Sequence, residues 1–184
     1  MIVSCESTAT DKEPSMAARS RSKRARITPE SLKDLVFVSD PQVSPDGSRV
    51  LFTRKVIGDR NAYETSLWTV STRRGDPKPF THGPRDSRGR WSKDGSRIAF
   101  VSARDKDIPQ LHVIEADGGE ARQLTHLPQG SIGAFHWSPD GRRIAFTFRE
   151  REQDWTREAI DHRKEHGLTP PPRVLHNTMY RLDG

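Results

Sequence analysis

Hydrophobic and polar positions follow one phrase that occurs three times along the chain. Each copy has a Ser-x-Asp-Gly tetrapeptide, then two further residues ending in Arg, then a short apolar run. The copies occupy Val43–Phe52, Trp91–Phe100 and Trp137–Phe146. The tetrapeptide predicts a tight turn, because Asp bonds locally and Gly adopts positive φ. The following runs, 49–53, 97–102 and 143–148, predict inner strands that are buried on both faces.

A second pattern completes each unit. Ser66–Val70 aligns with Gln110–Ile114, and Lys78–His82 aligns with Arg122–His126, 44 residues further on in both cases. Each unit therefore has four strands, and the turn aspartates Asp46, Asp94 and Asp140 repeat at intervals of 48 and 46 residues. A four-stranded repeat of this length is typical of β-propeller blades.

The predicted fold class is all-β, an incomplete β-propeller with two full four-stranded blades and part of a third. The blades are expected at about 40–82, 86–126 and 133–184, within one propeller region spanning 28–184. A short helix is predicted from Thr28 to about Leu35, where Pro29 suits the first helical position. A helical insertion at 154–166 ends at Gly167, and Arg173–Gly184 is again extended.

Charge is concentrated in one place. Residues 16–28 contribute +5 of the net charge of +6, so the pI of about 9.8 describes a basic tail, predicted to be disordered over 1–27. The near-neutral remainder argues against a nucleic-acid partner, although binding through the tail stays open as a weaker alternative.

The N-terminal region and the apolar runs bear on location. Cys5 is the single cysteine, which excludes an internal disulfide, and only three apolar residues and a serine precede it. The interpretation is a chain without an export signal, hence cytoplasmic, with Met1 or Met16 as its true start. The longest apolar runs are four residues, which predicts no membrane partner.

The repeats resemble TolB-type propeller repeats, and the ends of the region resemble something more specific. Ser39–Gly47 at the entry, Trp155–Glu158, Pro171–Val174 and Tyr180–Gly184 are similar to the prolyl oligopeptidase family, in its acylaminoacyl-peptidase or dipeptidyl-peptidase-like branch. That family implies a propeller, commonly of seven blades, that restricts access of peptides to a Ser-Asp-His hydrolase domain. The resemblance implies peptide substrates, a hydrolase domain or further blades as partners, and no metal or other cofactor.

The expected function is the N-terminal part of a substrate-gating propeller from a serine peptidase. The 184 residues contain no Gly-x-Ser-x-Gly nucleophile elbow, so the α/β-hydrolase domain is expected to be absent and the chain inactive alone. Whether the chain itself counts as an enzyme stays open. The alternative is a non-enzymatic TolB-like propeller that binds proteins. Because outer blade faces lack neighbours, the isolated chain is expected to be poorly soluble or partly unfolded.

One segment matches a metal-binding pattern. His162 and His166 frame a His-x-x-Glu-His sequence, whose i, i+4 spacing places two imidazoles on one helix face. The surrounding residues are charged and offer neither a third ligand nor an apolar wall that excludes water. This favours an exposed helix whose side chains form ion pairs, such as Arg157 with Asp161.

The other regular side chains have structural interpretations. His82 and His126 are expected to follow the outermost strands, and Trp91 and Trp137 to pack between blades. The three turn aspartates are expected to lie well apart, each serving its own turn. The sequence therefore predicts no catalytic, cofactor-binding or metal-binding residue.

Overall fold

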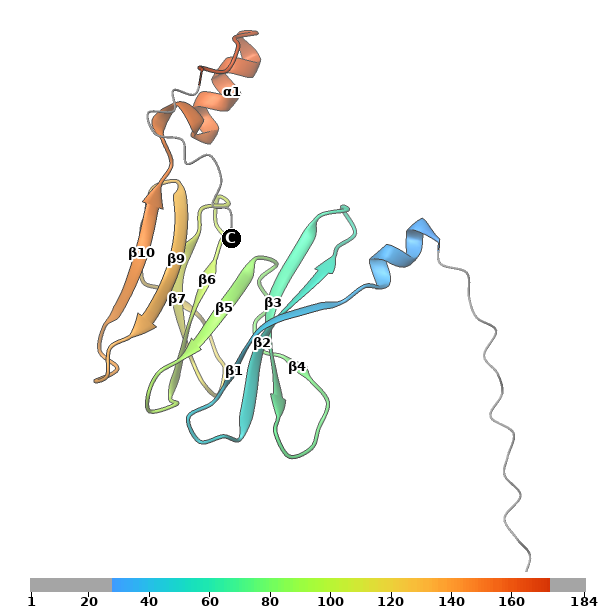
Figure 1. Ribbon diagram of the computed structural model, residues 1–184, viewed down its shortest axis with the longest axis vertical. Helices are drawn as coiled ribbons and strands as arrows, with labels where there is room; N and C mark the ends of the chain where they lie inside the picture. The colour runs from blue at the N-terminus through green and yellow to red at the C-terminus, as the bar shows by residue number, and fades with distance from the viewer. Residues whose placement is uncertain (1–27, 173–184) are drawn as a thin grey trace, which may run out of the picture.

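The computed structural model describes residues 28–172 of the chain. The predicted tail 1–27, which includes Cys5 and Met16, and the predicted extended segment Arg173–Gly184 lie outside the described residues. Within them, three antiparallel sheets stand side by side, and a helix projects beyond the third sheet (Figure 1).

The first sheet has the strand order β1-β2-β3-β4. Its strands are β1 (Phe37–Val43), β2 (Arg49–Ile57), β3 (Tyr63–Ser71) and β4 (Lys78–Pro79). The prediction that the inner strand ends at Thr53 was too short, because β2 and β3 pair without interruption from Arg49↔Ser71 to Ile57↔Tyr63. A β-bulge lies in β1 between Ser39 and Gln42.

The second sheet repeats this plan in the order β5-β6-β7-β8. Its strands are β5 (Asp86–Trp91), β6 (Arg97–Ser102), β7 (Gln110–Glu115) and β8 (Arg122–Gln123). The outer strands β4 and β8 have two residues each, fewer than expected. The chain leaves the ladder there because Thr81 and Thr125 use their hydroxyls to accept hydrogen bonds from the backbone N–H groups of Leu67 and Leu111.

The third sheet has two strands among the described residues, β9 (Gly130–Trp137) and β10 (Ile144–Glu150). The expectation that all inner strands are buried on both faces holds for β6 but is wrong for β10. Every β10 residue except Ile144 and Phe148 is exposed, since no described element covers its second face. Burial on both faces requires a neighbouring sheet on each side.

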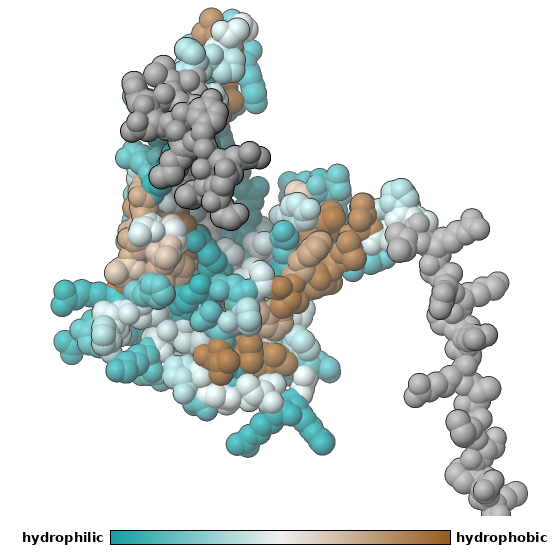
Figure 2. Space-filling model, viewed as in Figure 1, coloured by the Kyte–Doolittle hydropathy of each residue, from teal (hydrophilic) through white to brown (hydrophobic). Residues whose placement is uncertain are grey.

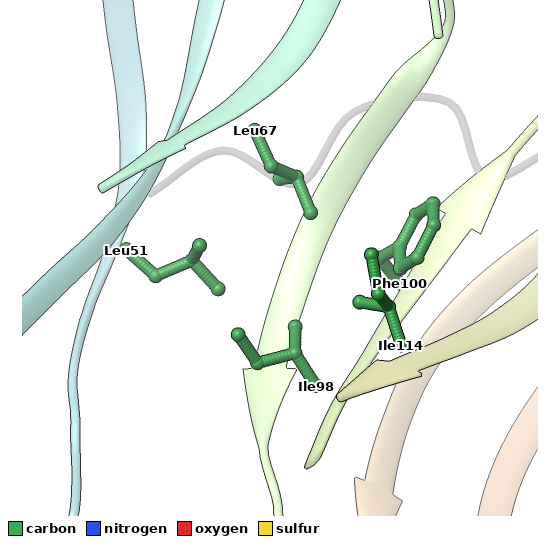
Figure 3. Packing of buried hydrophobic residues seen from close by; sticks show 5 residues of the cluster. All are labelled: Leu51, Leu67, Ile98, Phe100 and Ile114. Atoms are coloured by element: carbon green, nitrogen blue, oxygen red, sulfur yellow. The ribbon is translucent and has the colours of Figure 1, made fainter. Parts of the chain in front are cut away.

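The core lies between the sheets. Between the first and second sheets, Leu51 and Leu67 meet Ile98, Phe100 and Ile114, and all five are at most 5% exposed (Figure 3). Between the second and third sheets, the buried cluster consists of Ala99, Val101, Leu111, Ile132 and Phe135. The second sheet is therefore the only described sheet with both faces covered.

Short helices flank the sheets. The predicted N-terminal helix is a 3₁₀ helix, η1 (Pro29–Asp34), with no buried residue. The predicted insertion consists of η2 (Gln153–Trp155) and α1 (Arg157–Glu165). Gly167 ends α1 with φ +62°, as expected, and the N–H of Leu168 donates to the carbonyl of Arg163, which closes the C-terminal turn.

The first sheet has an exposed apolar edge. Figure 2 shows a brown strip where the chain passes from η1 into β1. Four consecutive side chains, Leu35, Val36, Phe37 and Val38, are 45–61% exposed there. Contiguous exposed apolar side chains are typical of interaction surfaces.

Candidate functional site

The three turns share one hydrogen-bond arrangement. In the first, the Ser44 hydroxyl donates to Asp46 Oδ1 at 2.6 Å and accepts from the Arg49 N–H at 2.9 Å. Asp46 also accepts from the backbone and hydroxyl of Ser48, and Gly47 has φ +72°. The same bonds recur in the turns at 92–97 and 138–143, except that Arg142 replaces the second serine.

These bonds stabilise the ionised aspartates. The Ser44 hydroxyl, followed by Ser48, holds the pKa of Asp46 well below its ordinary value of 3.8. The equivalent donors of Ser92 and Ser96 lower the pKa of Asp94 to about 2. The pKa of Asp140 is also lowered, mainly by Ser138. All the bonding partners of each aspartate belong to its own turn, so the structure supports a structural role rather than an acid–base or metal role.

Paired contacts join each sheet to the next. The guanidinium of Arg49 lies 5.0 Å from the ring centre of Trp91, and that of Arg97 lies 5.2 Å from Trp137. The indole N–H of Trp91 donates to the carbonyl of Gln42 at 3.3 Å, and that of Trp137 donates to the carbonyl of Arg90 at 3.0 Å. Both tryptophans therefore pack between sheets, as the sequence predicted.

A charged cluster lies where the sheets converge. Strand β5 contacts β1, β2 and β3 of the first sheet on one side and β9 of the third sheet on the other. At this inner edge Arg90 Nη1 lies 2.6 Å from Asp40 Oδ2. Arg88 donates to the carbonyls of Ile132 and Gly133 at 2.7 and 2.8 Å, and burial lowers its pKa.

Sequence reasoning missed this cluster, although a signal existed. Asp40 and Arg88 each lie six residues before the aspartate of the following turn, at the bulges of β1 and β5. Both adopt positive φ, +54° and +56°, which is uncommon for residues other than glycine. A bulge re-aims a side chain, and here it directs polar groups toward the neighbouring sheet.

A second polar site lies between the second sheet and the insertion. A pocket of about 130 Å³ is lined partly by Lys106, Gln129, Arg151 and Arg157. Asp107 pairs with Arg157 at 2.9 Å and also with Arg85, and these cations lower its pKa. The predicted pairing of Arg157 with Asp161 is wrong, because the loop before β7 brings Asp107 to the start of α1.

The histidines lie where the sequence predicted them, on an exposed helix and after the outer strands. His162 on α1 and His166 directly after it are both exposed, with ring centres 4.3 Å apart, and His166 Nδ1 lies 2.8 Å from the carbonyl of His162. His82 and His126 are exposed directly after the threonines that close the outer strands. Across residues 28–172, no group of three or more His, Cys, Asp or Glu side chains could hold a metal ion.

None of the helices within the described part of the chain is long and apolar enough to cross a membrane.

The repeated turns, the four-stranded sheets and their face-to-face stacking define the class of the protein as a β-propeller. The family described as TolB beta propeller domain, PD40, matches residues 10–173. The chain belongs to this family. The fold class predicted from sequence, an incomplete all-β propeller, is confirmed.

Two curated relatives are named as peptidases. The uncharacterized peptidase YuxL of Bacillus subtilis is 36% identical over 161 residues, which cover 86% of this chain and 24% of the relative. Dipeptidyl-peptidase 5 of Porphyromonas endodontalis is 32% identical over 129 residues, covering 68% of this chain and 18% of the relative. The chain thus spans a quarter or less of these relatives, and its resemblance to the propeller part of a peptidase family is confirmed.

Solved structures show the same fold. The acylaminoacyl peptidase of Pyrococcus horikoshii gives a TM-score of 0.56 at 21% identity, covering 68% of this chain and 19% of that protein. The β-propeller domain of the Trilobed protease from Pyrococcus furiosus gives 0.52 at 18% identity, covering 63% and 35%.

Proposed function

We propose that this chain is the opening part of a propeller that gates access of short peptides to a serine peptidase domain. The observation that carries the proposal is the match to YuxL, because 86% of this chain aligns with only 24% of a protein named as a peptidase. The remaining part of such a protein is long enough for further blades and a hydrolase domain. Acylaminoacyl- or dipeptidyl-peptidase-like hydrolysis, without metal or other cofactor, is the proposed activity of the whole protein.

We propose that the chain has two parts. Residues 1–27 form a basic tail, and 28–184 form the start of the propeller, with blades at about 40–82, 86–126 and 133–184. Catalysis belongs to a separate hydrolase domain, so this chain is inactive alone and contributes no catalytic residue. A cytoplasmic location is part of the same proposal, and cell fractionation with an antibody against the chain tests it.

The inner-edge cluster gives the gate a physical basis. In a closed propeller the first strands of all blades surround the central passage. Asp40 and Arg90 join two first strands across neighbouring sheets, at 25% side-chain exposure each. A partly buried ion pair of this kind holds the two sheets together, because the attraction between its charges is screened less than at the open surface. The pair therefore limits how far neighbouring blades part, and hence the size of peptide that enters.

Two activity measurements test the proposal. The chain alone and a longer protein that continues its reading frame are assayed on acetyl-aminoacyl and dipeptidyl chromogenic substrates. The chain alone is expected to be inactive. The longer protein is expected to be active, and a serine-directed inhibitor is expected to abolish that activity. A longer protein that has complete blades and the spectrum of a folded protein, but no peptidase activity, would contradict the proposal.

Gating itself is tested in the longer protein by Asp40→Asn, with Asp105→Asn in an exposed loop as the matched control. Hydrolysis of a tetrapeptide is expected to be unchanged, while kcat/KM for a thirty-residue peptide rises severalfold in Asp40→Asn only. The ratio of kcat/KM for the long peptide to kcat/KM for the short peptide is compared among the unaltered protein and the two variants. The same ratio in all three would refute the gate.

The second candidate is a non-enzymatic TolB-like propeller, and the family match itself favours it as much as it favours a peptidase. The coding sequence beyond the codon for Gly184 discriminates between the two. Further blades followed by Gly-x-Ser-x-Gly support the peptidase, whereas further blades without that motif support a protein-binding propeller.

A further inference from the structure

The polar pocket between the second sheet and the insertion carries an excess of positive charge. Lys106, Arg151 and Arg157 are its basic lining residues, whereas Asp107 is the acidic one. Both carboxylate oxygens of Asp107 are already engaged, Oδ1 by Arg85 and Oδ2 by Arg157. Asp107 therefore has no free oxygen for the other two cations of the pocket.

Lys106 and Arg151 are these two cations, and neither forms a salt bridge within the described part of the chain. Arg151 Nη1 donates to the carbonyl of Trp155 at 3.4 Å, which leaves its other guanidinium N–H groups for a further acceptor. The nearby carboxylate of Glu158 accepts instead from the side-chain amide of Gln129 at 2.6 Å. A hollow lined by charges of one sign attracts small ions of the opposite sign.

Gln129 holds the walls of the pocket together. It lies directly before β9, and its backbone carbonyl accepts the N–H of Arg151, at the end of β10, at 2.8 Å. Its side-chain oxygen accepts the N–H of Arg157, the first residue of α1, also at 2.8 Å. Because Gln129 occupies this N–H group, the side-chain cations and not the helix terminus give the pocket its charge.

The size and the remaining lining of the pocket restrict what enters it. Ile108 and Pro109, both half-buried, form an apolar part of the wall. The volume of about 130 Å³ admits one small group, since pockets for whole small-molecule ligands measure about 300–1,000 Å³. The loop also holds Lys106 and Asp107 at φ +47° and +58°, a costly conformation that is frequent at ligand clamps.

We propose that this pocket binds a carboxylate that carries a short apolar group, either the carboxyl terminus of a peptide or a free small carboxylic acid. The guanidinium of Arg151 and the ammonium of Lys106 bind the carboxylate, because arginine offers paired N–H groups that match its two oxygens. Ile108 and Pro109 contact the apolar group. The proposal rests on the pocket and not on peptidase activity, so it can fail while the proposed function holds.

Hydrogen exchange of the full chain at pH 7 tests the proposal. The probes are N-acetylalanylalanine and propionate, and the controls are N-acetylalanylalanine amide and sodium chloride at the same ionic strength. Both carboxylates are expected to slow exchange in segments 104–109 and 151–157, whereas the amide and chloride leave it unchanged. Protection at a lower concentration of the dipeptide than of propionate identifies a peptide terminus as the ligand, and the reverse order identifies a free acid.

Two variants and a control test the assigned charges. Arg151→Gln is expected to weaken carboxylate binding by about threefold to tenfold, because it removes an arginine that has no acid partner. Arg142→Gln, an equally exposed arginine in the turn before β10, is the control and is expected to bind as the unaltered chain does. Asp107→Asn is expected to bind several times more tightly, because it removes the internal carboxylate that competes for Arg157.

Three outcomes would overturn the proposal. The first is equal protection by a carboxylate and by the amide or chloride, which would show that the pocket does not select the group. The second is equal affinity of Arg151→Gln and Arg142→Gln. The third is an affinity of Asp107→Asn no higher than that of the unaltered chain. A gain in affinity cannot come from impaired folding, so Asp107→Asn remains informative even where Arg151→Gln is unstable.

Discussion

At the scale of single residues, the turn aspartates connect sequence most directly to structure. Each accepts hydrogen bonds from groups within its own turn, which fixes the geometry that reverses the chain between two strands. The serine that begins the turn is almost fully buried in the first two copies, at 5% for Ser44 and 0% for Ser92. A buried hydroxyl needs partners, and the aspartate supplies the acceptor.

The turns should make stability depend on pH in acid. The pKa of Asp94 is lowered from 3.8 to about 2 by the hydroxyls of Ser92 and Ser96. The unfolded chain therefore binds the proton first as pH falls, so the stabilisation is complete above pH 4 and is lost toward pH 2. The hydrogen-exchange protection of β5 and β6 in the unaltered chain is expected to fall more steeply over this range than that in Asp94→Asn. The control Asp105→Asn is expected to follow the unaltered chain, and identical slopes for all three would contradict the assignment.

The arginine–tryptophan contact is the residue-scale link between sheets. Arg97→Met keeps the apolar stem but removes the cation over Trp137 and the bond to the carbonyl of Gly141. The third sheet is expected to lose about 1–2 kcal/mol against local opening. Hydrogen exchange of β9 measures this, with Arg142→Met, an exposed neighbour, as the control. A loss of equal size in both variants would show that the contact has no specific value.

At the scale of elements, close packing of sheet on sheet depends on where side chains are missing. Gly89 in β5 faces the first sheet, and a Cβ there would come within 2.3 Å of Leu51 Cδ2 and 3.3 Å of Leu67 Cδ1. Both leucines are buried, at 1% and 0% exposure, and belong to the core cluster in Figure 3. The glycine therefore allows β5 to approach β2 and β3.

Gly89→Ala is expected to destabilise the contact between the first two sheets by about 1–3 kcal/mol through overpacking. In the double variant Gly89→Ala with Leu51→Val, the smaller valine side chain at position 51 is expected to recover part of that loss. A double-mutant cycle built from the hydrogen-exchange protection of β5 measures the coupling. Additive losses in the cycle would mean that the two positions do not compete for space.

The elements that the sequence predicted are those with a repeated local cause. The turns were predictable because Ser, Asp and Gly each have a defined turn chemistry, and the strands because apolar runs follow each turn. The packing of Trp91 and Trp137 between sheets followed from their equivalent positions. The C-terminal stop of the insertion helix at Gly167 is equally local, since glycine adopts positive φ readily.

What the sequence did not predict depends on neighbours in space. The salt bridge of Arg157 with Asp107 joins residues 50 positions apart, whereas helix spacing suggested Asp161. The Asp40–Arg90 pair also joins two sheets across 50 positions and requires a bulge that places a non-glycine residue at positive φ. The exposure of β10 likewise follows from the lack of a described element over its second face, and not from its own apolar sequence.

At the scale of the whole molecule, the two ends of the sheet stack differ from its middle. The second sheet is covered on both faces, while the first sheet exposes Val43 at 62% and the strip that begins at Leu35. The third sheet exposes Phe146 at 37%, although its counterpart Phe100 is fully buried. A stack of this kind gains stability from each neighbour that it acquires, as in other repeat proteins.

We infer that these sheets are consecutive blades whose outer faces require further blades. Calorimetric unfolding of the isolated chain at several concentrations tests this inference. We expect a broad or irreversible transition that shifts with concentration, because the open faces associate or remain partly unfolded. A single sharp and reversible transition in a monomer, unchanged by concentration, would contradict the claim.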